Sequence, residues 1–194
     1  MSSIPLVLAS SSPFRKGLLT RLTSEFSTFS PDVDESPQNQ EQPGQLASRL
    51  ALSKAQAGAQ RYPQHLIIGS DQVAICDQQT LSKPGSHARA VEQLSFMSGK
   101  LATFYTGLCL LDSATGQHQL HVEEFAVQFK ELTASQANNY LDREVPYGCA
   151  GSFKSEALGI ALCQRFDGRD PTALIGLPLI KLVEMLEQAG SPVI

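Results

Sequence analysis

The sequence predicts an α/β protein whose mixed β-sheet is flanked by helices. Residues Ile4 to Ala9 form a nearly continuous apolar run, typical of a strand buried on both faces, and a helical pattern follows it. The stretches Lys100–Asp112 and His118–Lys130 face each other across the turn Ser113–Gln117 as a hairpin. Because strands and helices alternate first and a hairpin follows, we expect parallel and antiparallel pairing in one sheet.

The first part of the chain predicts two helices and a central strand. Pro13 suits the first position of a helix and Ser12 its N-cap, and apolar residues then recur at helical spacing to Leu22. Residues 23–45 are acidic and proline-rich, which indicates a connection at the boundary of a lobe. A helix over 46–57, a strand over 65–76 and a turn over 77–80 follow.

The second part of the chain is also a series of helices, strands and loops. Ser82 and Lys83 must be extended because Pro84 follows them. Thr133 and Gln136 have the spacing of a capping box. We expect helices over 88–99, 133–143 and 179–186, a strand over 160–166, and a functional loop over 148–156 that is rich in small residues.

Composition and charge limit the function classes. The 194 residues are 42% hydrophobic and 18% charged, as in an ordinary globular protein of one domain. The net charge is −4, which excludes a long nucleic-acid backbone as partner. The four cysteines are scattered as free thiols would be, and no segment resembles an export signal or a membrane span. We therefore expect a cytoplasmic protein that binds neither nucleic acid nor membrane.

The serine loop before the first predicted helix is a candidate phosphate site. Ser10, Ser12 and Arg15 offer hydrogen-bond donors beside the helix N-terminus, and residues 1–22 contain three basic side chains and no acid. An ordinary capped helix with a solvated basic face explains the same residues. Neither a Walker loop nor a Gly-x-Gly-x-x-Gly motif is present.

Asp71 and Glu35 are candidate carboxylates for catalysis or metal binding. Asp71 interrupts an apolar strand, so it must be ion-paired, hydrogen-bonded, bound to metal or catalytic. Glu35 lies beside Asp32 and Asp34, and such a cluster either supplies oxygen ligands to a divalent cation or forms a solvated acidic turn. These residues alone leave both alternatives open.

Two lysines occupy positions unlike those of free surface lysines. Lys54 lies near the apolar stripe of its predicted helix, and Lys83 is held extended before Pro84. Because lysine stems often lie along apolar surface with the ammonium in water, neither residue by itself indicates a binding site.

Taken together, these segments resemble the Maf family of nucleotide pyrophosphatases, from about Leu6 to Leu186. No single segment is specific, but the ordered set is: Leu8–Arg15, Val33–Glu35, Lys54–Ala55, Gly69–Gln72, Lys83–Pro84, Tyr105–Gly107 and Gly176–Leu179. The resemblance implies one Maf-like domain over residues 1–194, with two lobes around a central cleft as in the Maf and ITPase folds. The sequence leaves the oligomeric state open, a homodimer included.

The resemblance also implies roles for the candidate residues. Asp71 would accept the proton of the attacking water, and Glu35 with Asp71 would hold Mg²⁺ or Mn²⁺. Hydrolysis would separate the α and β phosphates of a nucleoside triphosphate. The phosphates would be bound by Ser10, Ser12, Arg15, Lys54, Lys83 and Lys154.

The stretch Ala150–Glu156 resembles the Maf branch that hydrolyses 7-methyl-GTP, a clearance activity against modified nucleotides. That branch associates substrate specificity with Phe14, Gln72 and Glu156. N7-methylation makes guanine cationic, so an aromatic ring gains about 0.5–2 kcal/mol from cation–π attraction, and a carboxylate accepts from the guanine N1–H and amine. Core packing is the alternative for Phe14. Alternative functions are the dTTP/UTP branch of the family and a nucleotide-binding regulator of septum formation.

Overall fold

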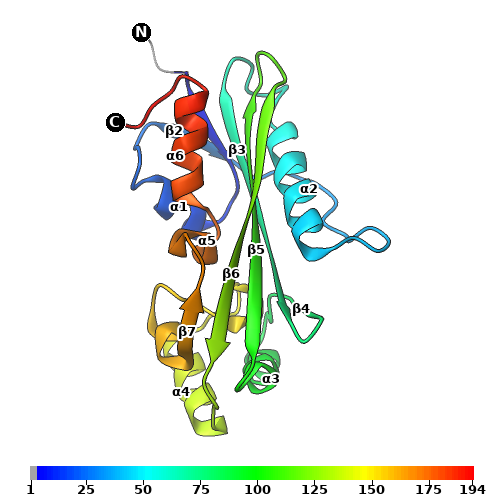
Figure 1. Ribbon diagram of the computed structural model, residues 1–194, viewed down its shortest axis with the longest axis vertical. Helices are drawn as coiled ribbons and strands as arrows, with labels where there is room; N and C mark the ends of the chain where they lie inside the picture. The colour runs from blue at the N-terminus through cyan, green and yellow to red at the C-terminus, as the bar shows by residue number, and fades with distance from the viewer. Residues whose placement is uncertain (1–3) are drawn as a thin grey trace. The chain divides into compact units, whose positions relative to one another are not determined.

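The computed structural model describes residues 4–194 and contains one mixed sheet (Figure 1). The strand order is β2-β1-β3-β5-β6-β7, and β4 pairs with β3. The strands are β1 (Leu6–Ala9), β2 (Phe26–Phe29), β3 (Leu66–Cys76), β4 (Gln79–Leu81), β5 (Leu101–Asp112), β6 (His118–Phe129) and β7 (Cys163–Asp167).

Helices connect and follow these strands. The α-helices are α1 (Pro13–Leu19), α2 (Pro43–Gln56), α3 (His87–Met97), α4 (Ala134–Glu144), α5 (Pro171–Ile175) and α6 (Leu179–Gln188). Two 3₁₀ turns, η1 (Ala150–Ser152) and η2 (Leu158–Leu162), lie between α4 and β7. Within residues 4–194, no helix combines the length and apolar character needed to cross a membrane.

The chain forms two compact units. The first unit comprises the chain up to Gln72, together with Thr106–Glu123 and Asp170–Ile194. The second comprises Val73–Tyr105 and Glu124–Arg169. The long strands β3, β5 and β6 each contribute residues to both units.

Side-chain alternation along β1 and β3 gives the first unit a core on each face of its sheet. β1 pairs in parallel with β2 and β3. Leu8 and Ile68 pack with α1 and α6 on one face, whereas Val7 and Ile67 pack with α2 on the other. Figure 1 shows α2 and α6 on opposite faces of these strands.

Helix α2 lies unusually close to the sheet because two strand residues lack side chains. A Cβ atom on Gly69 would overlap the Ala51 carbonyl oxygen, and one on Gly107 would overlap the Ala47 carbonyl oxygen. The backbone of α2 therefore rests directly on β3 and β5, as small residues at a helix interface allow.

The second unit combines the other ends of the long strands with α3 and α4. β4 pairs antiparallel with β3, and β7 pairs antiparallel with β6. Phe153 packs against Phe129 and Phe104, with ring centroids 5.2 and 6.0 Å away. This aromatic contact joins the loop after α4 to the sheet of its own unit.

The structure confirms the mixed sheet flanked by helices, the hairpin, and the capping box of Thr133 and Gln136. All four cysteines are free, and all but Cys149 are buried. Three sequence interpretations were wrong in part. The acidic connection contains β2, residues 79–80 belong to β4, and the strand expected from Ile160 starts only at Cys163, after η2.

We predict that Gly69→Ala destabilises the protein, because the new methyl group would meet the backbone of α2. The expected loss is about 1–3 kcal/mol or more, since a helix backbone cannot move aside as a side chain does. Gly17→Ala is the matched control. Gly17 lies exposed in α1 with nothing near its Cβ position, so this variant should gain about 0.5–1 kcal/mol. Urea unfolding of the three proteins checks both values, and equal stabilities would contradict the close approach.

Candidate active site

Lys54 joins the two carboxylates that the sequence singled out. Its Nζ atom lies 2.5 Å from Asp71 Oδ1 and 2.6 Å from Glu35 Oε1. Lys54 and Asp71 are 7% and 9% exposed, whereas 60% of the Glu35 side-chain surface is exposed. A lysine ammonium has three N–H donors, so this arrangement leaves the donor capacity for one further acceptor.

Helix geometry and strand alternation bring Lys54 and Asp71 together. Ala47, Ala51 and Ala55 follow one another at four-residue spacing along the side of α2 that meets the sheet, and Lys54 is the neighbour of Ala55. On β3, Asp71 shares the α2-facing side with Gly69 because strand side chains alternate. The close approach at Gly69 thus brings the Lys54 ammonium into contact with the buried Asp71 carboxylate.

Ser70 and Gln72 point to the opposite face of β3, toward the C-terminal part of the first unit. The Ser70 hydroxyl donates to the carbonyls of Gly107 and Gly176, at 2.8 and 2.9 Å. Gln72 Nε2 donates to Thr106 Oγ1 and to the Ala173 carbonyl, at 3.0 and 2.9 Å. These bonds fix the strand segment that bears Asp71 from the face opposite α2.

Arg15 is anchored by the same C-terminal turn. Its Nε donates to the Gly176 carbonyl at 2.8 Å, which holds α1 to the turn after α5. Burial lowers the pKa of the Arg15 guanidinium, and the negative charges of Asp71 and Glu35 oppose that shift. The guanidinium therefore experiences the field of both candidate carboxylates.

The serine loop has mainly local partners. Ser12 Oγ caps α1 by accepting from the Arg15 N–H at 3.4 Å, and Ser10 Oγ accepts from the Ser12 N–H at 3.1 Å. Ser10 is buried and Ser12 is half-buried. Each hydroxyl still carries a proton that it could donate.

Asp170 is a site-building residue that sequence reasoning missed. Ser70 and Thr106 lie in segments that carry the family resemblance, but their hydrogen-bonding roles were not predicted. Asp170 is 2% exposed and accepts hydrogen bonds from Thr172 and from the Ile180 N–H, so one carboxylate caps α5 and joins it to α6. The sequence signal was present, since Asp170 precedes Pro171 as an N-cap precedes a helix-starting proline.

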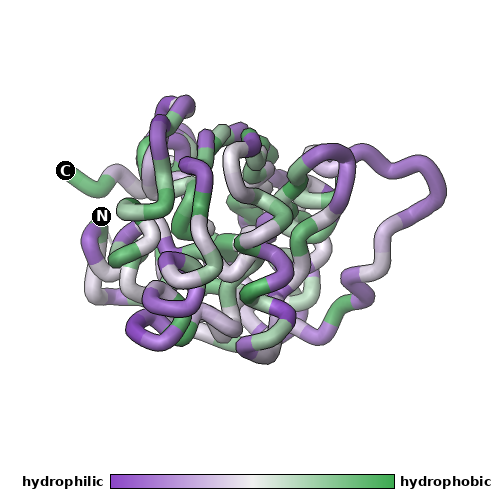
Figure 2. Tube along the Cα trace, turned by 90° about the horizontal axis from the view of Figure 1, so that it is seen from below, coloured by the Kyte–Doolittle hydropathy of each residue, from purple (hydrophilic) through white to green (hydrophobic). Residues whose placement is uncertain are grey.

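Arg49 holds the loop that carries Glu35 against α2. Its guanidinium donates to both carboxylate oxygens of Glu41, at 2.6 and 2.9 Å, and to the Ser36 carbonyl at 2.9 Å. Glu41 also accepts from the Gln38 N–H at 2.9 Å. This Arg49 clamp ties an exposed segment to α2, and Figure 2 shows the segment as a mostly hydrophilic loop.

The two carboxylates fit a divalent cation only in part. Glu35 and Asp71 both contact one nitrogen atom, the Lys54 ammonium, which lies between their carboxylates. Asp34, by contrast, accepts from the Ser36 N–H. Among residues 4–194, no group of three or more His, Cys, Asp or Glu side chains could hold a metal ion. A pair of carboxylates suits Mg²⁺ that is completed by water and substrate phosphates.

The remaining candidates, Lys83, Lys154 and Glu156, belong to the second unit. The expectation that Lys83 is unlike a surface lysine was wrong, because Lys83 is exposed on its segment before Pro84. Lys154 is half-buried and donates to the Glu144 carbonyl at 2.9 Å. Glu156 is exposed.

Phe14 and Gln72, the specificity candidates of the first unit, have different surroundings. Phe14 is half-buried at the start of α1, whereas Leu18 and Leu19 are fully buried in the core. The Gln72 amide is fixed in one orientation, because a flipped amide would turn its oxygen toward the Ala173 and Leu174 carbonyls. Its Nε2 therefore serves the fold, and Oε1 is the acceptor that a ligand could meet.

We predict a pH-dependent contribution of the Arg49 clamp to stability. Hydrogen bonding from Arg49 lowers the pKa of Glu41 from its ordinary 4.5 to about 2. Because the folded-state pKa is the lower one, the stabilisation is fully present above the unfolded-state pKa and is lost as pH falls toward 2. Urea unfolding should show Glu41→Gln less stable than the parent at pH 7, with the difference shrinking between about pH 5 and pH 2.

An Arg49→Met background serves as the control for this pH dependence. Without the guanidinium, the effect of Glu41→Gln on the free energy of unfolding should be nearly the same at pH 7 and at pH 2. A parent-minus-variant difference that stays constant from pH 7 to pH 2 would contradict the clamp.

The chain is similar over nearly its full length to a family model and to proteins of one name. The family model described as Maf-like protein matches residues 5–189. A protein of Nitrosococcus oceani named 7-methyl-GTP pyrophosphatase is 56% identical over 97% of this chain and 95% of its own length. Proteins of the same name from Pseudoalteromonas translucida and Colwellia psychrerythraea are 51% and 52% identical, over 98% and 97% of this chain and 94% of each relative. The chain belongs to the Maf-like protein family.

Proposed function

We propose that this protein hydrolyses 7-methyl-GTP to 7-methyl-GMP and diphosphate, clearing a modified nucleotide. The observation that carries the proposal is the buried Lys54 ammonium held between Asp71 and Glu35, in a chain that is more than half identical to relatives of that name. The free cysteines support a cytoplasmic location.

Asp71 is the proposed proton acceptor. Its Oδ1 is held by Lys54, and Ser70 and Gln72 fix the backbone on either side of it. A carboxylate so positioned can take a proton from a water molecule without moving, which is the main structural requirement for general-base catalysis. The Lys54 ammonium keeps the carboxylate in place from the side of α2.

Glu35 and Asp71 are the proposed residues that hold Mg²⁺ or Mn²⁺. The cation would offset negative charge on the phosphate oxygens and lower the pKa of water when bound. Because Glu35 is exposed and its loop is fixed by Arg49, its carboxylate is accessible without being free to swing away. Substrate phosphates would supply the ligands that the protein lacks.

The triphosphate is proposed to bind to hydroxyl and cationic groups of each unit. In the first unit these are the hydroxyls of Ser10 and Ser12, the Arg15 guanidinium beyond its bond to Gly176, and the remaining N–H of Lys54. In the second unit they are Lys83 and Lys154. Such groups act on phosphoryl transfer through position and charge rather than covalent chemistry.

Base recognition is proposed to depend on Phe14, Gln72 and Glu156. The half-buried Phe14 ring can stack on a cationic base. Gln72 Oε1 and the Glu156 carboxylate are acceptors, which suit the N1–H and amine donors of guanine. A site rich in acceptors discriminates against bases that leave those acceptors unpaired.

We predict that Asp71→Asn reduces diphosphate release by at least about 10²-fold, because an amide cannot accept the proton of water. The variant should keep the parent's circular dichroism spectrum, since Asn can still accept a hydrogen bond from Lys54. Asp142→Asn, which changes an exposed carboxylate on α4, is the control and should match the parent. Equal turnover by Asp71→Asn and the parent would reject the assignment.

We predict that 7-methyl-GTP gives the highest kcat/KM in a panel with GTP, dTTP, UTP and CTP, measured with Mg²⁺ and with Mn²⁺. The preference over GTP should be roughly 2- to 30-fold, the range of one cation–π contact. Phe14→Leu should bring that ratio toward one, while Phe96→Leu, which changes a half-buried ring of the second unit, should leave it unchanged. A preference for dTTP or UTP would contradict 7-methyl-GTP as the substrate, while hydrolysis of a nucleoside triphosphate to diphosphate would still stand.

A further inference from the structure

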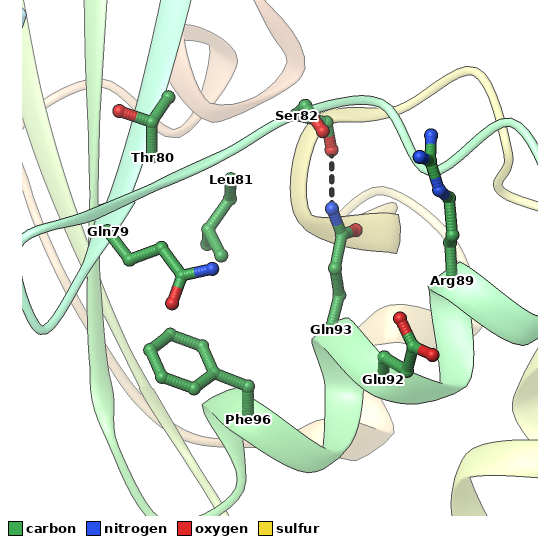
Figure 3. Close-up of a pocket in the computed structure, with 8 residues that line it drawn as sticks. All are labelled: Gln79, Thr80, Leu81, Ser82, Arg89, Glu92, Gln93 and Phe96. Carbon is green, nitrogen blue, oxygen red and sulfur yellow. Dashed lines mark hydrogen bonds between the residues drawn. The ribbon is translucent and has the colours of Figure 1, made fainter.

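Gln93 of α3 joins two segments of the second unit that the proposed function uses. Its Nε2 donates to the Ser82 carbonyl at 2.8 Å, and its Oε1 accepts from the Ser152 hydroxyl at 2.6 Å. Ser82 directly precedes Lys83, and Ser152 lies two residues before Lys154. Figure 3 shows the Gln93 side chain reaching from α3 to the Ser82 carbonyl.

Backbone hydrogen bonds already hold these two segments side by side. The Gly151 N–H donates to the Ser82 carbonyl at 3.3 Å, and the Gly85 N–H donates to the Tyr147 carbonyl at 3.1 Å. These bonds bracket Lys83 and Pro84. Gln93 adds the side-chain bonds that connect this pair of segments to a regular helix.

Ser152 has particular need of Gln93. It is fully buried, and its φ of 58° lies in the left-handed region that non-glycine residues seldom adopt. Strained backbone persists only where surrounding contacts determine it, and a buried hydroxyl needs a partner. The short bond to Gln93 supplies that partner at the residue where the chain turns toward Lys154 and Glu156.

Only one amide orientation satisfies both partners. The Ser82 carbonyl can only accept, so Nε2 must face it, and Oε1 then faces the Ser152 hydroxyl. The other polar side chains around this surface hollow of about 380 Å³ include Gln79, Arg89 and Glu92. Gln93 is the lining residue whose hydrogen bonds connect the Lys83 and Lys154 segments.

We propose that Gln93 is a positioning residue for substrate binding: it fixes the Lys83 segment to the segment that carries Lys154 and Glu156. This inference rests on the proposed function, because it requires those three side chains to contact the nucleotide. Gln93 itself touches no reacting atom. Its loss should weaken contacts made equally to substrate and transition state, which raises KM more than it lowers kcat.

The test compares Gln93→Met with Gln79→Met. The first variant keeps the side-chain volume and removes both hydrogen bonds, whereas the second makes the same exchange at an exposed residue around the same hollow. Steady-state kinetics are measured with the triphosphate that the parent hydrolyses best in the nucleotide panel. We expect Gln93→Met to raise KM about 5- to 20-fold with kcat changed less than about twofold, and Gln79→Met to match the parent.

Ser152→Ala separates the two bonds. It removes the link to the 149–156 segment and keeps the Gln93 bond to Ser82, so KM should rise by less than in Gln93→Met. Binding of the same triphosphate to each variant in an Asp71→Asn background, measured by calorimetry, should weaken in the same order as KM rises. Melting curves establish the folded fraction at the assay temperature.

The outcomes distinguish a failure of the Gln93 positioning role from a failure of the proposed nucleotide hydrolysis. If Gln93→Met folds and has the KM of Gln79→Met, the positioning role is wrong while the proposed function stands. A fall in kcat with unchanged KM also overturns it, since that pattern reports lost active protein or a lost transition-state contact. If the parent releases no diphosphate from any triphosphate, the proposed function itself fails, and the positioning role fails with it.

Discussion

The contact between α2 and β3 is the constraint on which the first unit depends. Gly69 and Gly107 have no side chains, so the helix backbone rests on the sheet and Lys54 meets Asp71 within 2.5 Å. A buried ammonium and a buried carboxylate are each costly alone, and pairing them offsets much of that cost. Glu35 adds a second carboxylate from an exposed loop, which the Arg49 clamp keeps in place. The separation between the α2 backbone and the strands therefore determines whether Lys54 can contact Asp71.

Strand alternation gives the two faces of the Gly69–Gln72 segment different roles. Along Gly69–Gln72, the odd positions face α2 and provide the close approach and the carboxylate, while Ser70 and Gln72 bind the C-terminal turn that also anchors Arg15. In the second unit, side-chain hydrogen bonds from the helix α3 hold the segments before Pro84 and around η1, which have little regular structure.

Sequence reasoning identified the residue types of the site but not their partners. Asp71 stood out because a carboxylate in an apolar strand needs compensation, and Lys54 because of its place beside an apolar stripe, yet their pairing depends on a helix packing distance that no local pattern encodes. The strand β2 was missed because its Ser27 and Thr28 are exposed and its acidic surroundings resemble a loop. Lys83 was expected to differ from a free surface lysine but is exposed, because burial depends on tertiary packing that neighbouring residues do not reveal. Asp170 directly precedes Pro171, a pattern that predicts a helix N-cap, but this helix start was not predicted.

The most direct test of this account is a double-mutant cycle on the Lys54–Asp71 pair, followed by urea unfolding at pH 7. Lys54→Met alone leaves Asp71 buried without its counter-charge. Asp71→Asn alone leaves the ammonium its ion pair with the exposed Glu35 and a hydrogen bond to the new amide, but removes its buried counter-charge. The double variant removes both charges. The account predicts a coupling energy of about 1–3 kcal/mol, with the double variant more stable than Lys54→Met alone. Strictly additive effects, with no recovery in the double variant, would show that the two charges do not stabilise each other and would contradict the arrangement at the centre of the site.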